Sequence, residues 1–122
     1  MNKVLVVEDD RAIREMCTVI LEGENYTVFK ADNGKEATKV LDEESDIDLI
    51  ITDIIMPEKE GIQFIREVKR TYPDIKILAI SGGGAIDAKQ YLELAQNLGA
   101  DSILEKPFDD QDLLEAIDKI KV

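Results

Sequence analysis

With 122 residues, the chain is long enough for one domain with a substantial core and too short for two independent domains. Hydrophobic residues make up 44% of it and charged residues 34%, and no apolar stretch approaches the roughly 18 to 20 residues that a membrane span needs. The formal net charge of -12 would be repelled by phosphate backbones, so we do not expect direct binding to nucleic acid.

The N-terminal residues and the single cysteine narrow the class of protein further. Residues 1–3 lead directly into an apolar run without the features of a secretory signal, which predicts a soluble, cytoplasmic protein. Cys17 is the only cysteine, which excludes an internal disulfide and a cysteine-based metal site. It lies among the apolar residues of a helical pattern, so we expect a thiol buried in the core.

The first third of the chain predicts a strand, a helix and a second strand. The apolar run at 4–7 is typical of a strand covered on both faces, and three acidic residues follow it at once. Apolar residues at helical spacing over 13–21 predict a helix, with Asp10 as its N-cap and Gly23 at its end. The second strand is expected at 26–29.

The middle of the chain continues this alternation. Asn33, with Glu36 three residues on, fits a capping box at the start of a helix that carries apolar residues over 37–41. A strand is expected at 49–51. A helix with apolar residues over 62–68 follows, and we expect Gly61 to let the chain bend into that helix.

The last third repeats the pattern twice. A strand is expected at 75–80, after the Tyr72-Pro73 pair that ends the preceding helix, and another at 102–104. The helices after them carry apolar residues at 92–98 and 113–120, with Gly99 as a stop signal and Asp109 as an N-cap. Five strand-helix units of this kind predict a doubly wound α/β fold, with parallel strands and helices on both faces.

Reactive side chains follow four of these strands. Glu8 and Asp9 follow the first strand, Asp53 the third, Ser81 the fourth and Lys106 the fifth. A parallel sheet brings the carboxyl ends of its strands to one edge, where ligands bind. Carboxylates gathered there either keep protons or share a cation, and oxygen ligands favour Mg²⁺ before Ca²⁺. Asp53 is then suited to attack a phosphoryl donor, while Ser81 and Lys106 hold the phosphoryl oxygens.

Four segments carry a resemblance to a known family. VLVVEDD (4–10), DIIMPEKEG (53–61), AISG (79–82) and EKPF (105–108) resemble, in order and interval, the receiver domain of bacterial two-component response regulators. The resemblance covers essentially the whole chain, as one receiver domain over 1–122. It implies a flavodoxin-like (βα)5 fold with a five-stranded parallel sheet of order 2-1-3-4-5.

The resemblance also implies roles for the residues at the sheet edge. A partner histidine kinase or phosphotransfer protein would phosphorylate Asp53. The implied Mg²⁺ ligands are Asp9, Asp53, the backbone carbonyl of Ile55 and, through a water, Glu8. Ser81 matches the switch hydroxyl, and Lys106 matches the family's lysine, which a cis proline usually follows, here Pro107. A target protein is expected to bind the face formed by the fourth helix, the fifth strand and the fifth helix.

Two features depart from the family pattern. The family commonly has an aromatic residue three positions before the lysine, and this chain has Ile103 there. We therefore expect the signal to pass through the loop at 82–84 and the fourth helix. The positions of Ile55 and Gly83 often carry polar side chains that influence the hydrolytic water, so their absence predicts a long-lived phosphoryl group.

Other functions have specific obstacles in the sequence. Singly, Asp53 could cap a turn, Ser81 could satisfy a loop amide and Lys106 could lie at the surface. A Mg²⁺-dependent phosphatase with an aspartyl nucleophile would carry a second Asp at the position of Ile55. A flavin-binding module would not place three carboxylates where its phosphate binds. A degenerate receiver that acts by binding alone would not need the full set. The favoured prediction is a stand-alone phosphorylation switch or relay intermediate, and not a turnover enzyme.

Overall fold

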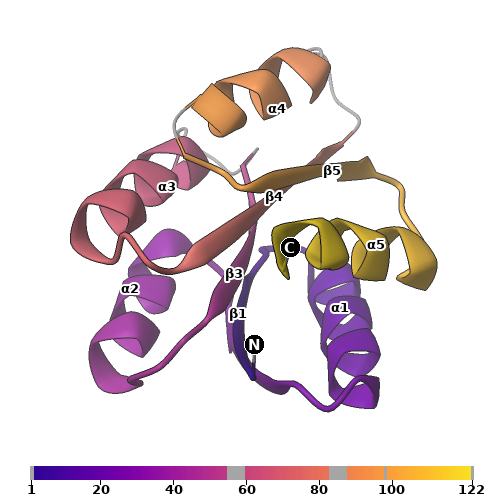
Figure 1. The fold of residues 1–122 in the computed structure, drawn as a ribbon, viewed down its shortest axis with the longest axis horizontal. Helices are drawn as coiled ribbons and strands as arrows, with labels where there is room; N and C mark the ends of the chain where they lie inside the picture. The colour runs from indigo at the N-terminus through magenta and orange to yellow at the C-terminus, as the bar shows by residue number, and fades with distance from the viewer. Residues whose placement is uncertain (1, 55–59, 83–87, 98, 122) are drawn as a thin grey trace.

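The computed structural model describes residues 2–54, 60–82, 88–97 and 99–121, and within them five strands alternate with five helices (Figure 1). The expected roles of Ile55, Gly83, Gly84 and Leu98 therefore lie outside the described residues. The elements are β1 (Lys3–Val7), α1 (Arg11–Gly23), β2 (Thr27–Ala31), α2 (Gly34–Glu43), β3 (Leu49–Asp53), α3 (Glu60–Thr71), β4 (Lys76–Gly82), α4 (Ala88–Asn97), β5 (Ser102–Lys106) and α5 (Asp110–Lys121).

The strands form one parallel sheet of order β2-β1-β3-β4-β5. The order reverses at β1, as expected of a doubly wound sheet. Helices α1 and α5 cover one face, and α2, α3 and α4 cover the other (Figure 1). The predicted fold class and strand order are confirmed.

Alternating side chains of the central strands supply both core layers. In β1, Val4 and Val6 pack toward α1 and α5, whereas Leu5 and Val7 pack toward α2 and α3. All four side chains are fully buried, which explains why the strand is apolar without alternation. Each such side chain contributes roughly 1.5 to 3 kcal/mol by burial.

Side chains fix the starts of three helices. Asp10 accepts hydrogen bonds from the backbone N–H groups of Ala12 and Ile13, which confirms it as the N-cap of α1. Asp109 and Asp112 each accept from the other's backbone N–H, so α5 begins with a complete capping box.

The capping box predicted for α2 forms only in part. Asn33 accepts from the backbone N–H of Glu36, as expected. The Glu36 carboxylate, however, accepts from the backbone N–H of Asp32, one residue before the N-cap. Both bonds still satisfy backbone donors at the helix start, so the function of the box is kept.

All five strands have bounds that differ by one or two residues from the prediction; β1 begins at Lys3, and β4 runs from Lys76 to Gly82. Strand β2 begins at Thr27, because the Tyr26 backbone N–H donates to the Leu21 carbonyl and closes the end of α1. Strands β3 and β5 each run two residues further than predicted, to Asp53 and Lys106. Their pairing with β4 continues to those residues, so both polar side chains are held by the sheet itself.

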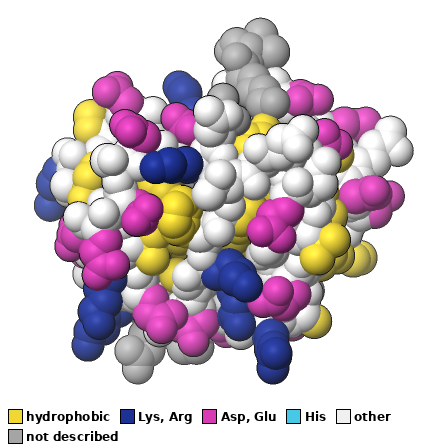
Figure 2. Space-filling view, turned by 90° about the horizontal axis from the view of Figure 1, so that it is seen from below, with side chains coloured by type: hydrophobic (Ala, Val, Ile, Leu, Met, Phe, Trp, Pro, Cys, Tyr) yellow, Lys and Arg dark blue, Asp and Glu magenta, His cyan; other side chains and the backbone are white. Residues whose placement is uncertain are grey.

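The surface carries charge of both signs. On the face shown in Figure 2, Asp and Glu side chains lie among Lys and Arg side chains, and hydrophobic side chains are visible between them.

The side chain of Cys17 is fully buried, which confirms the predicted core thiol. Burial, with a smaller effect of Glu8, raises the pKa of this thiol to about 11. No helix in the described ranges is long and apolar enough to span a membrane.

Candidate functional site

The direction of side chains along the strands brings three charged residues to one pocket. Glu8, Asp53 and Lys106 stand at the carboxyl ends of β1, β3 and β5. Each follows, by two residues, a side chain in the core layer beneath α1 and α5; these are Val6, Ile51 and Leu104. Because side chains two residues apart along a strand share a face, all three are directed to the same side of the sheet edge.

Lys106 links the two buried carboxylates of this pocket. Its Nζ donates to Glu8 Oε1 at 2.5 Å and to Asp53 Oδ2 at 3.0 Å. Glu8 is fully buried, and Asp53 is 4% exposed. Ligand oxygens of Glu8, Asp9 and Asp53 lie within 4.8 Å of one another, and Asp9 is exposed to solvent. The expected meeting of these chain segments at one edge is confirmed.

The pocket favours a proton on Glu8 and a charge on Lys106. Burial, followed by a hydrogen bond to Asp53, raises the pKa of Glu8 to about 8, although Lys106 partly offsets the shift. Burial lowers the pKa of Lys106, but its hydrogen bonds to Glu8 and Asp53 outweigh burial, so its pKa is raised overall. Without a bound cation, one proton and one ammonium thus relieve the repulsion between the carboxylates.

The oxygen atoms of the pocket fit a hard divalent cation. Glu8 Oε2 is buried and has no hydrogen-bond partner among the described residues. With Asp9 and Asp53 it forms a set of carboxylates that offers only oxygen ligands, which suits Mg²⁺. The backbone carbonyl of Ile55, the remaining implied ligand, lies outside the described residues.

Ser81 lies on β4, the strand between those of Asp53 and Lys106. Its hydroxyl is fully buried, and Ser81 Oγ also has no hydrogen-bond partner in the described part of the chain. A buried hydroxyl without a partner is unfavourable unless a ligand or water completes its hydrogen bond. Asp53 pairs with Ile80, the residue before Ser81, so the hydroxyl lies at the same edge of the sheet.

Two further features of β5 bear on the family pattern, namely the packing of Ile103 and the peptide bond that follows Lys106. Ile103 is half-buried and packs against the core layer beneath α2, α3 and α4, opposite to the face of Lys106. The peptide bond between Lys106 and Pro107 is cis, as the resemblance implied.

The sequence prediction missed Arg14 and gave Gly61 a different role from the one its packing indicates. Arg14 Nη1 donates to the backbone carbonyl of Glu8 at 2.8 Å and so ties α1 to the end of β1. Gly61 lies against the backbone that follows β3: a Cβ atom there would stand 2.6 Å from the Asp53 carbonyl oxygen and from Ile54 Cα. Close approach therefore gives a reason for this glycine, and the bend into α3 stays a prediction.

The fold and the pocket define a flavodoxin-like α/β domain with an acidic site at the carboxyl edge of its sheet. The chain matches the family profile described as "Response regulator receiver domain" over residues 4–118. It therefore belongs to the receiver domains of two-component response regulators.

Individual relatives agree with this assignment. The transcriptional regulatory protein CpxR of Escherichia coli (strain K12) is 37% identical over 117 residues, which are 96% of this chain and 48% of CpxR. The response regulator receiver protein CpdR of Brucella abortus (strain 2308) is 34% identical over 122 residues, which are 100% of this chain and 98% of CpdR. A crystal structure of a response regulator receiver domain protein from Clostridium thermocellum superposes with a TM-score of 0.87 at 30% identity, and the match covers 98% of this chain and 94% of that one. The chain thus spans about half the length of the CpxR proteins that it matches.

Proposed function

We propose that this domain is a Mg²⁺-dependent phosphoacceptor that takes a phosphoryl group onto Asp53 from a histidine kinase or a phosphotransfer protein. The observation that carries the proposal is the ammonium of Lys106, which lies 3.0 Å from the buried Asp53 carboxylate in a pocket lined by two more carboxylates. Asp53 is a nucleophile in this arrangement, and its neighbours can neutralise the charge that a phosphoryl group brings.

The chemistry is a transfer between two nucleophiles. An oxygen of the Asp53 carboxylate forms a bond to phosphorus, while the bond from phosphorus to the donor's histidine nitrogen breaks and its electron pair returns to that nitrogen. Asp9, Asp53 and, through water, Glu8 would hold Mg²⁺, which would supply positive charge beside the phosphoryl oxygens. The Lys106 ammonium and the Ser81 hydroxyl donate hydrogen bonds to the remaining phosphoryl oxygens.

The proposal extends to how the domain is used. CpdR, described as a receiver protein, matches along nearly its whole length, which supports a stand-alone switch or relay intermediate. The target protein binds the face of α4, β5 and α5 in this proposal, and the location is cytoplasmic. A phosphatase that turns over small substrates is disfavoured because Ile55 stands where such enzymes carry their second aspartate.

Intact-mass measurement tests the phosphoacceptor directly. The protein is incubated with acetyl phosphate and Mg²⁺, and a phosphoryl adduct is expected that is absent from Asp53→Asn and from a sample with EDTA. Asp118→Asn, which removes an exposed carboxylate on α5, is the matched control and keeps the adduct. An adduct that persists in Asp53→Asn would exclude Asp53 as the acceptor, and continuous release of phosphate from phosphate esters would favour the phosphatase.

A further inference from the structure

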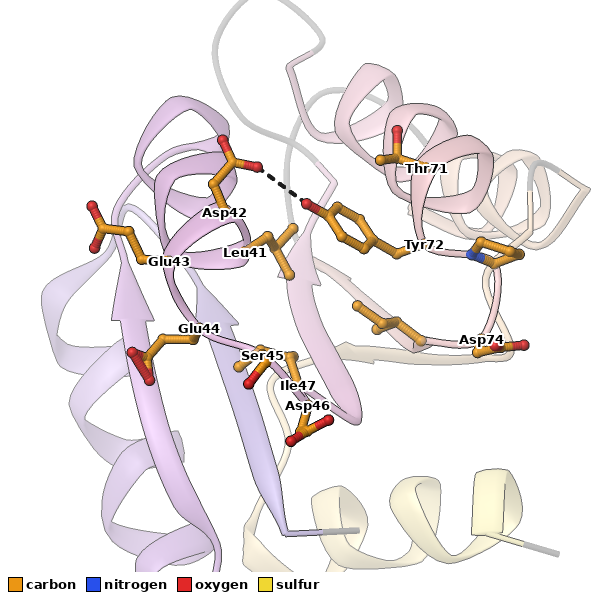
Figure 3. A pocket seen from close by; sticks show the side chains of 12 residues that line it. Leu41, Asp42, Glu43, Glu44, Ser45, Asp46, Ile47, Thr71, Tyr72 and Asp74 are labelled. Carbon is orange, nitrogen blue, oxygen red and sulfur yellow. Dashed lines mark hydrogen bonds between the residues drawn. The ribbon is translucent and has the colours of Figure 1, made fainter.

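Figure 3 shows a second groove of the molecule from close by. It has a volume of about 570 Å³ and is lined by the segments at 41–47 and 71–75. These segments lead into β3 and β4, which begin at Leu49 and Lys76, so the groove lies at the amino edge of the sheet. Because Asp53 stands at the carboxyl edge, the groove is separate from the phosphoacceptor pocket.

The floor of the groove is apolar and held in place. Leu41, Ile47 and Ile75 line it and belong to the core layer beneath α2 and α3. The ring of Tyr72, half-buried, packs against that layer, and its hydroxyl donates to Asp42 Oδ1 at 3.1 Å across the groove (Figure 3). The hydrogen bond links the end of α2 to the residue after α3, so the concave shape exists before any partner binds.

Acidic residues make up much of the lining, although the side chains of Glu43 and Glu44 extend away from Tyr72 (Figure 3). The lining contains five carboxylates and neither Lys nor Arg; the five are Asp42, Glu43, Glu44, Asp46 and Asp74. None of them forms an ion pair within the described part of the chain. Two ammonium groups lie at the groove, since Lys3 donates to the Ser45 carbonyl and Lys69 donates to the Ile75 carbonyl, but Lys69 pairs with Asp101 and neither forms an ion pair with a carboxylate of the lining.

We infer that this groove binds a basic segment of another protein, with one apolar side chain on the floor and Lys or Arg side chains against the rim. The apolar floor supplies a site for burial, and the five carboxylates of the lining outnumber the ammonium groups of Lys3 and Lys69, so they favour positive charge around it. The volume lies in the range of about 300 to 1,000 Å³ in which pockets enclose small ligands, so it fits one or two side chains and not a whole helix.

The charge of the chain decides against two other occupants. A second copy of this chain would bring its own net charge of -12 to an acidic rim, and nucleic acid would bring phosphates. The inference goes beyond phosphoacceptance and does not depend on it, since no residue of the phosphoacceptor pocket lines the groove.

A short peptide tests the inference. The probe is acetyl-Gly-Lys-Lys-Leu-Lys-Lys-Gly-amide, titrated into the ¹⁵N-labelled protein at low salt and followed by backbone amide chemical shifts. The expected shifts concentrate at 41–47 and 71–75. Replacing the leucine of the probe by serine is expected to weaken binding about tenfold, because the buried leucine contributes at least 1.4 kcal/mol.

A second test removes negative charge from the rim of the groove. The triple variant Glu44→Gln, Asp46→Asn, Asp74→Asn is expected to bind the probe about tenfold more weakly. Asparagine keeps the left-handed backbone of Asp46, whose φ is 66°, so the fold is retained and circular dichroism checks it. The matched control, Glu22→Gln, Glu93→Gln, Asp118→Asn, removes three exposed carboxylates outside the groove and is expected to bind as the wild type does.

Several outcomes would overturn the inference. These are no binding at low salt, shifts spread over the whole surface, equal binding of the leucine and serine probes, or an equal loss in both triple variants. The last two would identify a general attraction between opposite charges. Asp53→Asn is expected to keep full binding of the probe, so the failure of one proposal can be told apart from the failure of the other.

Discussion

Replacement of Gly61 by alanine tests how closely α3 is packed against the reactive aspartate. Gly61 is the second residue of α3, and it is buried against the backbone that follows β3. A Cβ atom at this position would lie 2.6 Å from the Asp53 carbonyl oxygen, 2.6 Å from Ile54 Cα and 2.9 Å from the Ile54 carbonyl oxygen. All three atoms belong to the backbone, so no change of side-chain rotamer can relieve the contact.

The expected loss of stability follows from these distances. Ordinary contact begins at 3.4 Å, so the start of α3 or the end of β3 must move by about 0.8 Å. Overpacking of this kind typically destabilises by about 1 to 3 kcal/mol, and the higher helix propensity of alanine offsets part of it. We expect Gly61→Ala to lower the free energy of unfolding by about 1 to 2 kcal/mol. Because the Asp53 backbone moves as well, phosphorylation by acetyl phosphate should also slow.

Urea unfolding monitored by circular dichroism measures the first effect, and intact mass against time measures the second. Gly23→Ala is the matched control, because nothing lies within 4 Å of a Cβ atom at the end of α1. The control should unfold at the wild-type urea concentration or slightly above it. If Gly61→Ala were as stable as Gly23→Ala and were phosphorylated at the wild-type rate, close packing would not be the reason for this glycine.

Four further predictions concern the pocket and its surroundings. The pKa of Glu8 is raised from 4.5 to about 8 on folding, so the folded protein binds more protons than the unfolded one between these pH values. Without divalent cations, the stability of the protein should therefore fall as the pH rises from 4.5 to about 8. Urea titrations of Glu8→Gln should show a weaker dependence of stability on pH. At pH 8, Mg²⁺ at about 100 times its dissociation constant should stabilise the wild type by about 2.7 kcal/mol, and Asp9→Asn should lose most of this gain in thermal unfolding. Asp109→Ala removes the first bond of the α5 capping box and should lower stability by about 1 kcal/mol in urea, whereas an unchanged midpoint would show that Asp112 caps the helix alone. The phosphoryl group should be lost faster from Ile55→Asn than from the wild type in a mass time course, and equal rates would remove the proposed reason for a long lifetime.

The sheet was predictable because its signals are local. Each buried strand is a continuous apolar run, and each run is separated from the next by helical periodicity and a stop signal. The ends of β3 and β5 could not be predicted from the sequence, because Asp53 and Lys106 are polar. Only their pairing with β4 extends the two strands to these residues. A single strand's sequence carries no information about how far its neighbour continues.

The sequence predicted that the functional side chains gather at one edge of the sheet, but it did not predict the contacts between them. Parallel topology alone brings Glu8, Asp53 and Lys106 to one side. The direct contact between Lys106 and Glu8, which are 98 positions apart, depends on strand register and on the shared direction of their side chains. Gly61 likewise gave no local signal for its role, because its neighbours in space belong to the backbone after a different element.

The reach of Lys106 has a mechanical consequence for the domain. Strands β3 and β4 lie between β1 and β5, yet one ammonium joins groups from the first and the last strand in the chain. Any new anion beside Asp53 would draw on the same donor that holds Glu8. The edge strand β5 and the residue after β1 are thus joined through one atom, so a displacement of the Lys106 ammonium would change the contacts of both.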